Sequence, residues 1–422
     1  MDIIPKTLKK QISISKKDKE DEDKERYSRL ETIHGWKQGV VKNSTALIGG
    51  VGAIGNEVAK NLALIGCGKI LLVDKEIIEL SNLTRSIMFR QRDIGRSKVE
   101  VVAEQIKEVN PDVKVATFHG NIASLGLGVL RRMDLIFCDF DSRLPRIILN
   151  DACIRVKKPW IDAGLNDVNV LRGAVTVFDV PAGACYACSL SSEMVKEILE
   201  KGTGRGVICA EIERESEKRG FVPSTPMMAS LIGALQVQEG LKILMNNEEI
   251  TPLLNKIIHI DTQDHKMEVF TRRRNPKCLI HQIRSPIPEK DIIEVKEFNS
   301  NSTTIGELLE KVKKDLGKKA RISLWYDLVI SASCPNCKKT EKVYQSPYVF
   351  IEHQSCSHCG TPQEIAKSVS ELDENVDFLN LTLTQGGLRQ LDILEAVIDD
   401  GKKSISKFYE LTGDEMEVMN FE

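Results

Sequence analysis

The chain has 422 residues, of which 41% are hydrophobic and 28% are charged, and its formal net charge is -2. This composition is typical of a soluble globular protein with roughly two to three domains, and the balanced charge excludes a global field that would recruit nucleic acid or anionic membrane. No apolar run approaches the roughly 20 residues that span a bilayer, and the first residues, MDIIPKTLKKQ, lack the apolar core of a signal peptide. We therefore expect a cytoplasmic protein with no nucleic-acid and no membrane partner.

The first two-fifths of the chain alternate between short apolar runs and helical patterns. Residues 16–26 are all charged, so we expect a solvated helix or a disordered leader over 1–24. Predicted strands then cover 45–49 (TALIG), 69–74 (KILLVD) and 134–139 (DLIFCD). Predicted helices follow them, from Asn56, over Val99–Val109 and over Leu144–Val156. This order predicts an α/β fold, a Rossmann-like and mostly parallel sheet with helices on both faces.

The remainder contains a long polar segment, a helix and a domain boundary. Residues 189–225 are polar and rich in glycine, which predicts a long loop, whereas Pro226 opens an apolar helix over 226–245. Strands are expected over 255–261 and 266–270. A composition shift over 272–288 predicts a boundary between domains 25–285 and 290–422. In the smaller C-terminal α+β domain, we expect a helix over 305–316 and strands over 320–330 and 378–384.

A glycine-rich turn predicts a phosphate site. Gly50, Gly52 and Gly55 lie between a strand and a helix, where glycines let the backbone approach a phosphate near the helix N-terminus. Asp74 ends the next strand and could accept a hydrogen bond from a ribose hydroxyl. A tight turn that binds no ligand is the structural alternative, and NAD is the conventional ligand of such a motif.

The segment 74–98 favours ATP over NAD. It places Asn82, Arg85, Gln91 and Lys98 closely behind the ribose acid, and a triphosphate needs such cations whereas a dinucleotide does not. Asp141 follows the strand 134–139, a position well suited to hold Mg²⁺ on the phosphates.

Four linked motifs resemble those of the ThiF/MoeB/ubiquitin-activating superfamily. They are RYSRL (26–30), IGGVGAIG (48–55), DKEIIELSNLTRSIMFRQRDIGRSK (74–98) and CDFDSRLPR (138–146), and the resemblance covers about 25–281. It implies that Asp74 holds the ribose, that Asn82, Arg85 and Lys98 hold the phosphates, and that Asp141 coordinates Mg²⁺. It also implies that Arg29 reaches into a partner subunit's site, so that the enzyme is a homodimer.

The chain departs from these family motifs at a few positions. Ala53, Glu76, Ser86 and Ser142 stand where the family has glycine, aspartate, glutamine and asparagine. The change to Ser142 is the one expected to alter contacts with adenine or substrate.

Eight residues predict two structural zinc sites. Cys334, Cys337, Cys356 and Cys359 have the spacing of a zinc ribbon with four thiolates and no open position, and redox-active dithiols are the alternative. Cys185 and Cys188 form half of another site. The resemblance places its other half at Cys278 and His281, although a buried Cys278 with a surface His281 is also compatible with the sequence.

Cys209 is a candidate nucleophile. It lies alone in the polar segment 189–225, where nearby cations could lower the pKa of a thiol. In the superfamily, the thioester cysteine of ubiquitin-activating members occupies this region, and an incidental cysteine is the alternative. Cys67, Cys138 and Cys153 lie in apolar elements and are interpreted as core residues.

The resemblance implies an enzyme that adenylates the C-terminal carboxylate of a ubiquitin-like or sulfur-carrier protein, with transfer to Cys209 and then to a conjugating enzyme. No cysteine follows Cys359, which argues against a rhodanese domain. The tail looks more like that of activating enzymes in bacterial ubiquitin-like conjugation systems. Two alternatives stay open: a peptide or tRNA adenylyltransferase without an enzyme thioester, and a non-catalytic scaffold with a vestigial nucleotide site.

Overall fold

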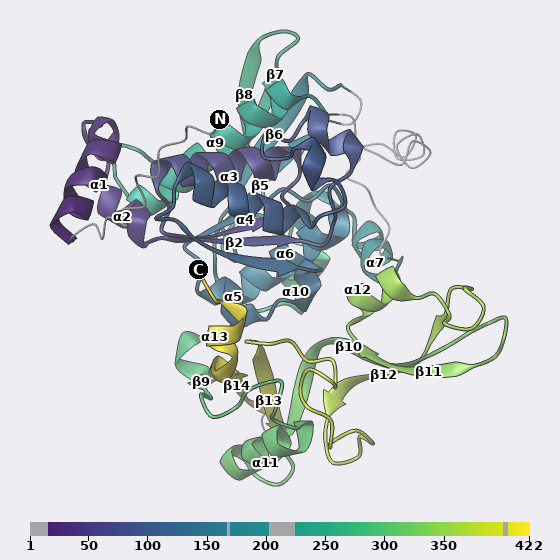
Figure 1. Ribbon diagram of the computed structural model, residues 1–422. Helices are drawn as coiled ribbons and strands as arrows, with labels where there is room; N and C mark the ends of the chain where they lie inside the picture. The colour runs from purple at the N-terminus through teal and green to yellow at the C-terminus, as the bar shows by residue number, and fades with distance from the viewer. Residues whose placement is uncertain (1–15, 167–168, 202–223, 400–403) are drawn as a thin grey trace, which may run out of the picture.

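The computed structural model describes residues 16–166, 169–201, 224–399 and 404–422. These ranges form a large α/β domain with a smaller domain packed below it in Figure 1. Within these ranges, no helix combines the length and the apolar composition that crossing a membrane would require.

The large domain is built on one eight-stranded sheet in the order β3-β2-β1-β4-β5-β6-β7-β8. The strands are β1 (Thr45–Gly49), β2 (Lys69–Asp74), β3 (Lys114–His119), β4 (Leu135–Cys138), β5 (Trp160–Leu165), β6 (Arg172–Phe178), β7 (Lys256–Asp261) and β8 (Lys266–Thr271). The first five strands in this order pair in parallel, and β5 to β8 pair antiparallel. The predicted parallel α/β core is therefore confirmed, with an antiparallel extension at one edge.

Helices cover both faces of this sheet, as expected. They are α1 (Lys16–Glu31), α2 (Gln38–Asn43), α3 (Ala53–Ile65), α4 (Lys98–Val109), α5 (Leu127–Arg131), α6 (Arg143–Val156), α7 (Ser192–Lys201), α9 (Pro226–Met245) and α10 (Leu279–Ile283). Ala46 and Ile48 of β1 pack in one core with α3, α4 and α9, whereas Leu47 packs in another with α5 and α6. Because successive strand residues face opposite ways, a strand buried on both sides needs the almost entirely apolar sequence that β1 has, with Thr45 its one polar residue.

Single-turn 3₁₀ segments connect several elements. They are η1 (Leu80–Thr84), η2 (Gln91–Asp93), η3 (Ile122–Ser124), η4 (Tyr186–Ser189), η5 (Glu289–Asp291), η6 (Ile351–His353) and η7 (Thr412–Asp414).

The C-terminal domain is α+β, as predicted, and has a six-stranded sheet. Its elements are β9 (Ile292–Glu294), α11 (Ile305–Leu316), β10 (Arg321–Ser333), β11 (Thr340–Gln345), α12 (Pro347–Phe350), β12 (Glu364–Leu372), β13 (Ile393–Asp399), β14 (Ser404–Glu410) and α13 (Glu415–Val418). The long strand β10 pairs with β11, β12 and β13, and β14 joins β13 to β9.

Two predictions of secondary structure were wrong. Residues 378–384 form turns instead of a strand, because Phe378 and Leu383 reach the domain core from a turn and need no strand to bury them. The polar segment 189–225 contains the helix α7, in which Val195 and Ile198 face the core. These two apolar residues are three positions apart, a spacing of one helical face that the polar composition hid.

Charged and aromatic contacts join the two domains. Arg131 and Arg132, at the end of α5, both form ion pairs with the fully buried side chain of Glu410 on β14. Arg155 of α6 places its guanidinium 4.0 Å from the centre of the Trp325 ring on β10. The smaller domain is therefore held against the large one by groups that are buried in the contact.

Candidate active site

A glycine-rich turn joins β1 to α3 and forms one wall of a large cavity. Gly50 has φ +88°, which favours glycine, and a Cβ on Gly55 would lie only 2.0 Å from the Gly50 carbonyl oxygen. A Cβ on Gly52, which precedes α3, would point into open space. The glycines therefore let the helix pack tightly while leaving its N-terminus open to an anion.

The cavity has a volume of about 1630 Å³ and lies along the carboxyl ends of the central strands. Most of the nucleotide-site residues predicted from sequence line it: Gly50, Gly52, Asp74, Asn82, Arg85, Lys98 and Asp141. The carboxyl edge of a parallel sheet is where this class of fold binds ligands.

Asp74 stands at the end of β2 and is only 7% exposed. Its Oδ2 accepts a hydrogen bond from the Val51 N–H at 2.8 Å, and its Oδ1 accepts one from the Glu76 N–H at 2.9 Å. Burial raises the pKa of the Asp74 carboxyl, an effect opposed by the nearby Lys98. The two backbone contacts fix the carboxylate beside the glycine turn, as a ribose-binding acid requires.

Lys98 opens α4 with its side chain almost buried in the cavity wall, and it forms an ion pair with the half-exposed Glu76. Arg85 is anchored by a 2.7 Å hydrogen bond from its Nη1 to the Ser81 carbonyl. Asn82 is buried, and its Oδ1 accepts a hydrogen bond from the Glu79 N–H. These three side chains are thus fixed in the lining of the cavity that also contains the start of α3.

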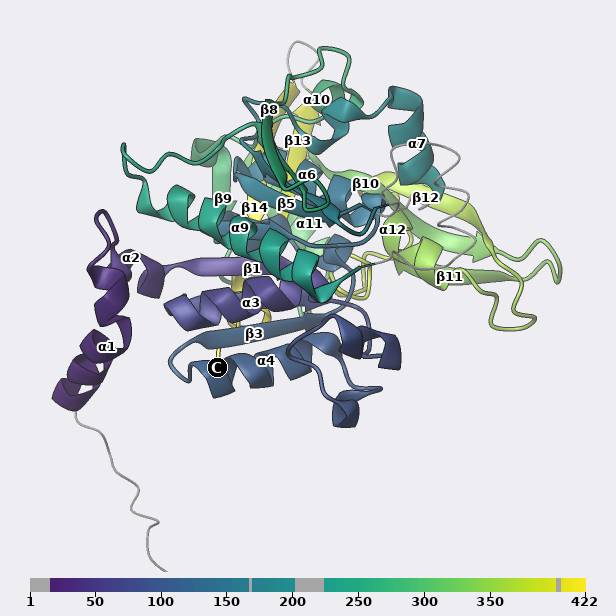
Figure 2. The ribbon, with the colours of Figure 1, turned by 90° about the horizontal axis from the view of Figure 1, so that it is seen from above.

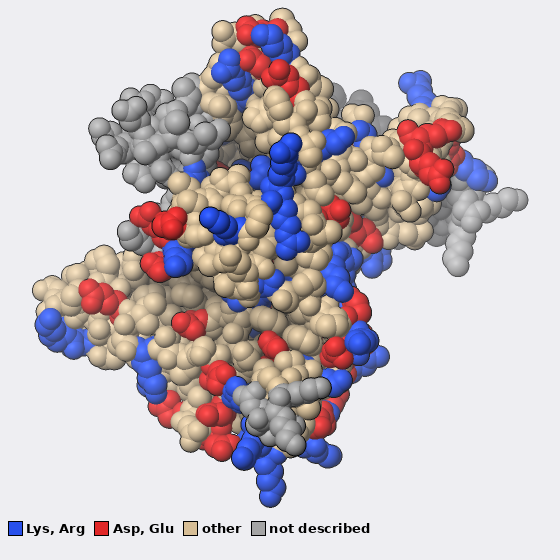
Figure 3. Space-filling view, turned by 180° about the vertical axis from the view of Figure 1, so that it is seen from behind, with Lys and Arg blue, Asp and Glu red and all other residues tan. Residues whose placement is uncertain are grey.

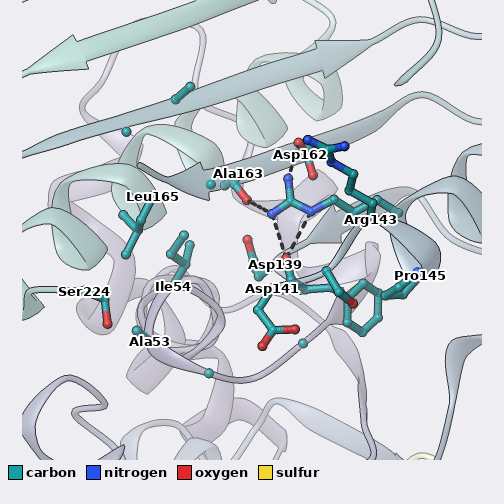
Figure 4. A pocket seen from close by; sticks show the side chains of 18 of the residues that line it. Ala53, Ile54, Asp139, Asp141, Arg143, Pro145, Asp162, Ala163, Leu165 and Ser224 are labelled. Carbon is teal, nitrogen blue, oxygen red and sulfur yellow. Dashed lines mark hydrogen bonds and ion pairs between the residues drawn. The ribbon is translucent and has the colours of Figure 1, made fainter. Parts of the chain in front are cut away.

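The sequence analysis missed three further cavity residues: Asp139, Arg146 and Asp162. Figure 4 shows Asp139 and Asp141 on the loop after β4, with Asp162 on the neighbouring strand β5. Arg146 Nη1 donates to Asp162 Oδ2 at 2.8 Å, and the same guanidinium donates to the carbonyls of Phe140 and Ala163. Asp141 is exposed at the mouth of this group and has the hard oxygen ligands that Mg²⁺ prefers.

Asp139 is the unusual member of this group. Neither of its buried carboxylate oxygens has a hydrogen bond of ordinary geometry to the described residues, although the Gln236 side chain lies close enough to oppose the rise in its pKa. Burial, together with the neighbouring Asp162 carboxylate, holds the pKa of Asp139 well above its ordinary value. Because burying a charge is costly, this environment favours the protonated form of the carboxyl.

Three of the predicted nucleotide-site and catalytic residues that the structure describes do not line the cavity: Gly55, Gln91 and Arg29. Gln91 is exposed in η2, outside the cavity wall. Arg29 is exposed on α1, which projects from the body of the molecule in Figures 1 and 2. Cys209 lies outside the described residues.

From the nucleotide-site residues, the cavity continues along the antiparallel end of the sheet. There it is lined by side chains of both charges: Arg172, His259, Asp261, Lys266, Glu268 and Arg272. Basic and acidic residues are similarly interspersed over the face of the molecule seen in Figure 3. This arm is long and polar, which suits an extended peptide better than a compact apolar ligand.

The structure brings together both predicted sets of metal ligands. The ligand atoms of Cys185, Cys188, Cys278 and His281 lie within 4.8 Å of one another. His281 Nε2 is buried with no hydrogen-bond partner in the part of the chain that is described, and the neighbouring Cys185 lowers the pKa of Cys188 to about 4. A thiolate and an unpartnered ring nitrogen fit a Cys₃His zinc site.

The second set lies in the C-terminal domain, where one pair precedes β11 and the other precedes β12. The four sulfur atoms of Cys334, Cys337, Cys356 and Cys359 also lie within 4.8 Å of one another. Four thiolates with no open position could bind zinc in a closed structural site. None of the eight ligands is among the residues that line the cavity, although Tyr186 and Ser189 beside the first set do line it. Both sets would therefore stabilise structure and would not take part in chemistry.

The chain is similar to several known proteins. The chain is 28% identical over 281 residues to ubiquitin-like modifier-activating enzyme 5 of Dictyostelium discoideum, which covers 62% of this chain and 69% of that protein. It is 30% identical to adenylyltransferase and sulfurtransferase MOCS3 of Aedes aegypti, covering 66% of this chain and 60% of that protein. A solved structure of E. coli MccB with MccA-N7isoASN aligns with a TM-score of 0.49 at 26% identity, covering 61% of this chain and 74% of MccB. Residues 25–280, more than half of the chain, match the model of the ThiF family, and the chain therefore belongs to that family.

Proposed function

We propose that this protein uses ATP and Mg²⁺ to adenylate the C-terminal carboxylate of a ubiquitin-like or sulfur-carrier protein. The observation that carries this proposal is the lining of one cavity by the start of α3, Asp74, Lys98 and Asp141. The relatives named as a modifier-activating enzyme and an adenylyltransferase support the same reaction class.

In this reaction, an oxygen of the carrier's carboxylate attacks the α-phosphorus of ATP. The bond from that phosphorus to the oxygen bridging to the β-phosphorus breaks, and pyrophosphate leaves with the electron pair. Lys98 and Arg85 would stabilise the charge that develops on the leaving pyrophosphate. Asp141 would hold Mg²⁺, which when bound supplies further neutralisation of phosphate charge.

The polar arm of the cavity along β6, β7 and β8 would accept the carrier's extended tail. Its lining by Arg172, His259 and Lys266 offers donors for the carbonyl oxygens of a peptide backbone. Because the arm and the nucleotide-site residues line one cavity, a tail lying in the arm would bring its last carboxylate toward the α-phosphate.

ATP–pyrophosphate exchange tests this function. Purified ubiquitin-like and sulfur-carrier proteins that end in Gly-Gly are supplied one at a time with ATP, Mg²⁺ and labelled pyrophosphate. At least one is expected to support incorporation of label into ATP, and the same carrier lacking its final glycine is not. Absence of exchange with every carrier would contradict the activating function, and exchange with a short peptide or a tRNA alone would favour the alternative adenylyltransferase.

A second step would transfer the carrier to Cys209. Its thiolate would attack the acyl carbon, the bond to the adenylate oxygen would break, and AMP would leave. Met194 of α7 and Ser224, which flank the segment containing Cys209, both line the cavity and so favour this step. A carrier adduct that is sensitive to dithiothreitol should form in the wild type and in Cys67→Ala, and should be lost in Cys209→Ala. An adduct that survives in Cys209→Ala assigns the step to another residue.

We also propose that the enzyme acts as a homodimer in which Arg29 enters the partner's cavity, and that a conjugating enzyme receives the thioester. The exposure of Arg29 on the projecting helix α1 supports such a reach. Mixing the inactive Arg29→Ala and Lys98→Ala proteins should restore part of the exchange activity, because a mixed dimer then contains one intact site. No recovery after subunit exchange would place Arg29 outside the partner's site.

A further inference from the structure

A short segment of the C-terminal domain forms part of the nucleotide cavity. Ile351 and Glu352, in η6, are the two described residues beyond 285 that line it. They follow α12 and lie between the cysteine pairs 334/337 and 356/359. The cysteine cluster thus closes a loop whose middle reaches the cavity of the other domain.

An ion pair ties this segment to the end of β2. Lys75 Nζ lies 2.5 Å from Glu352 Oε1, and the Glu352 side chain is only 23% exposed. The carbonyl of Lys75 is in turn 3.0 Å from His119 Nε2, at the end of β3. Glu352 therefore contacts the residue directly after Asp74, the acid expected to hold the ribose.

Apolar packing fixes the same segment more firmly than the ion pair can. Tyr348 and Val349 of α12 pack against the large domain's core, which includes Ile122 and Ala123 of η3. The helix α12 also contacts η3 directly. A half-exposed ion pair is worth about 1 kcal/mol or less, so this apolar contact is what holds Ile351 and Glu352 at the cavity.

The position of the ribose acid indicates which part of ATP lies here. Phosphates belong at Gly52 and the start of α3, and the ribose belongs at Asp74. The base must then extend away from the phosphates, over the ends of β2 and β3. The cavity lining there is Lys75, Gly120, Asn121 and Ile122, with Ile351 and Glu352 added from the C-terminal domain.

We propose that the C-terminal domain supplies one wall of the base subsite, in which Ile351 packs against the purine of ATP and Glu352 positions Lys75. This inference rests on the proposed use of ATP. Ile351 would contact the ligand directly, whereas Glu352 acts through Lys75 and is a positioning residue. The two domains would then form a single nucleotide site, and the cysteine-closed loop would be part of it.

The test compares an intact nucleotide with its phosphate portion alone. Isothermal titration of the full chain with α,β-methylene-ATP and Mg²⁺ is set beside titration with inorganic tripolyphosphate. Ile351→Ala should weaken binding of the ATP analogue about tenfold, because it removes much of an aliphatic contact, and should leave tripolyphosphate binding unchanged. Ile405→Ala, an exposed isoleucine of β14, is the matched control and should change neither.

The role of Glu352 is tested by coupling. Glu352→Gln and Lys75→Met should each weaken binding of the ATP analogue a few-fold. The double variant should bind the analogue no more weakly than the worse of the two single variants. Independent, multiplicative losses would overturn the positioning role, since they would mean that the two side chains act separately.

The outcomes separate this inference from the proposed function. If the wild type and Ile351→Ala bind the analogue equally well, Ile351 does not contact the base. The proposed use of ATP would be unaffected by that result. If Ile351→Ala weakens the binding of tripolyphosphate and of the ATP analogue alike, the variant has disturbed the whole site. The assignment of Ile351 to the base subsite would then also be wrong. A wild type that binds no ATP analogue contradicts both proposals.

Discussion

Arg146 Nη1 lies 2.8 Å from Asp162 Oδ2, and this contact joins α6 to the end of β5 beneath the cavity. The remaining donors of the guanidinium are directed at the carbonyls of Phe140 and Ala163. Asp139 shares this buried environment without a hydrogen bond of ordinary geometry to the described residues. The floor of the cavity therefore has two carboxyls and one cation in close proximity.

Asp139→Asn should increase the stability of the protein at neutral pH. Since burial holds the pKa of Asp139 well above its ordinary value, the folded chain keeps a proton that the unfolded chain releases. The wild type must then lose stability as the pH rises from about 4 toward that raised pKa, by about 1.4 kcal/mol for each unit passed. Urea unfolding between about pH 5 and about pH 8 should show this loss in the wild type and a flatter profile in Asp139→Asn.

Asp141→Asn is the matched control, because this carboxyl is exposed on the same loop. The free energy of unfolding of Asp141→Asn should change with pH as steeply as that of the wild type. If the free energy of unfolding of Asp139→Asn falls with pH as steeply as that of the wild type, another buried group is responsible for the loss.

Lys98→Ala should lower the rate of ATP–pyrophosphate exchange by about 10²–10³-fold, the usual cost of removing one group that stabilises transition-state charge. The side chain is nearly buried in the cavity wall. Burial raises the pKa of the Asp74 carboxyl, and the charge of Lys98 lowers it. Lys107→Ala, on the exposed last turn of the same helix, should retain wild-type exchange. Equal exchange rates in Lys98→Ala and Lys107→Ala would show that Lys98 does not take part in the reaction.

The nucleotide side of the cavity could largely be predicted from sequence, because local elements create it. Gly50 and Gly52 follow β1, Asp74 ends β2, and Lys98 begins α4. Each position depends on a strand or helix end that the apolar pattern already marks. Gln91 follows the same motif, but η2 turns it outward, and no local pattern indicates that turn.

Zinc analysis of the purified protein should give two zinc ions per chain, one for each cluster. Cys337→Ser should leave one zinc and reduce the stability of the C-terminal domain, because a closed structural site contributes directly to folding. His281→Ala should also contain one zinc ion per chain. That result would show that the histidine is the fourth ligand of the first site. Two zinc ions in His281→Ala would contradict that assignment.

Glu410→Ala should destabilise the protein by about 1.5–3 kcal/mol, since it removes the buried acceptor of two ion pairs while Arg131 keeps Glu289 and Arg132 keeps Glu415. The loss is measured as a lower urea midpoint. Glu364→Ala, on the exposed strand β12, is the control and should change stability by less than about 0.5 kcal/mol. Equal midpoints would mean that the ion pairs contribute nothing to domain packing.

The floor and the far wall of the cavity could not be predicted, since both arise from tertiary contacts. Asp139 and Asp162 meet only because β4 and β5 pair with Cys138 opposite Asp162, a register that sequence does not disclose. Ile351 and Glu352 are more than 200 residues beyond Asp74 and reach the cavity through docking of a second domain. No local sequence pattern marks any of these residues as part of a cavity.

The adenylate itself provides the most direct test of the central claim. A carrier that supports exchange is incubated with the enzyme, ATP, Mg²⁺ and pyrophosphatase, and its intact mass is then measured. We predict a gain of one AMP unit on the carrier's C-terminus with the wild type and Lys107→Ala, and no gain with Lys98→Ala. A carrier of unchanged mass, with ATP converted to ADP and phosphate, would contradict carboxylate activation.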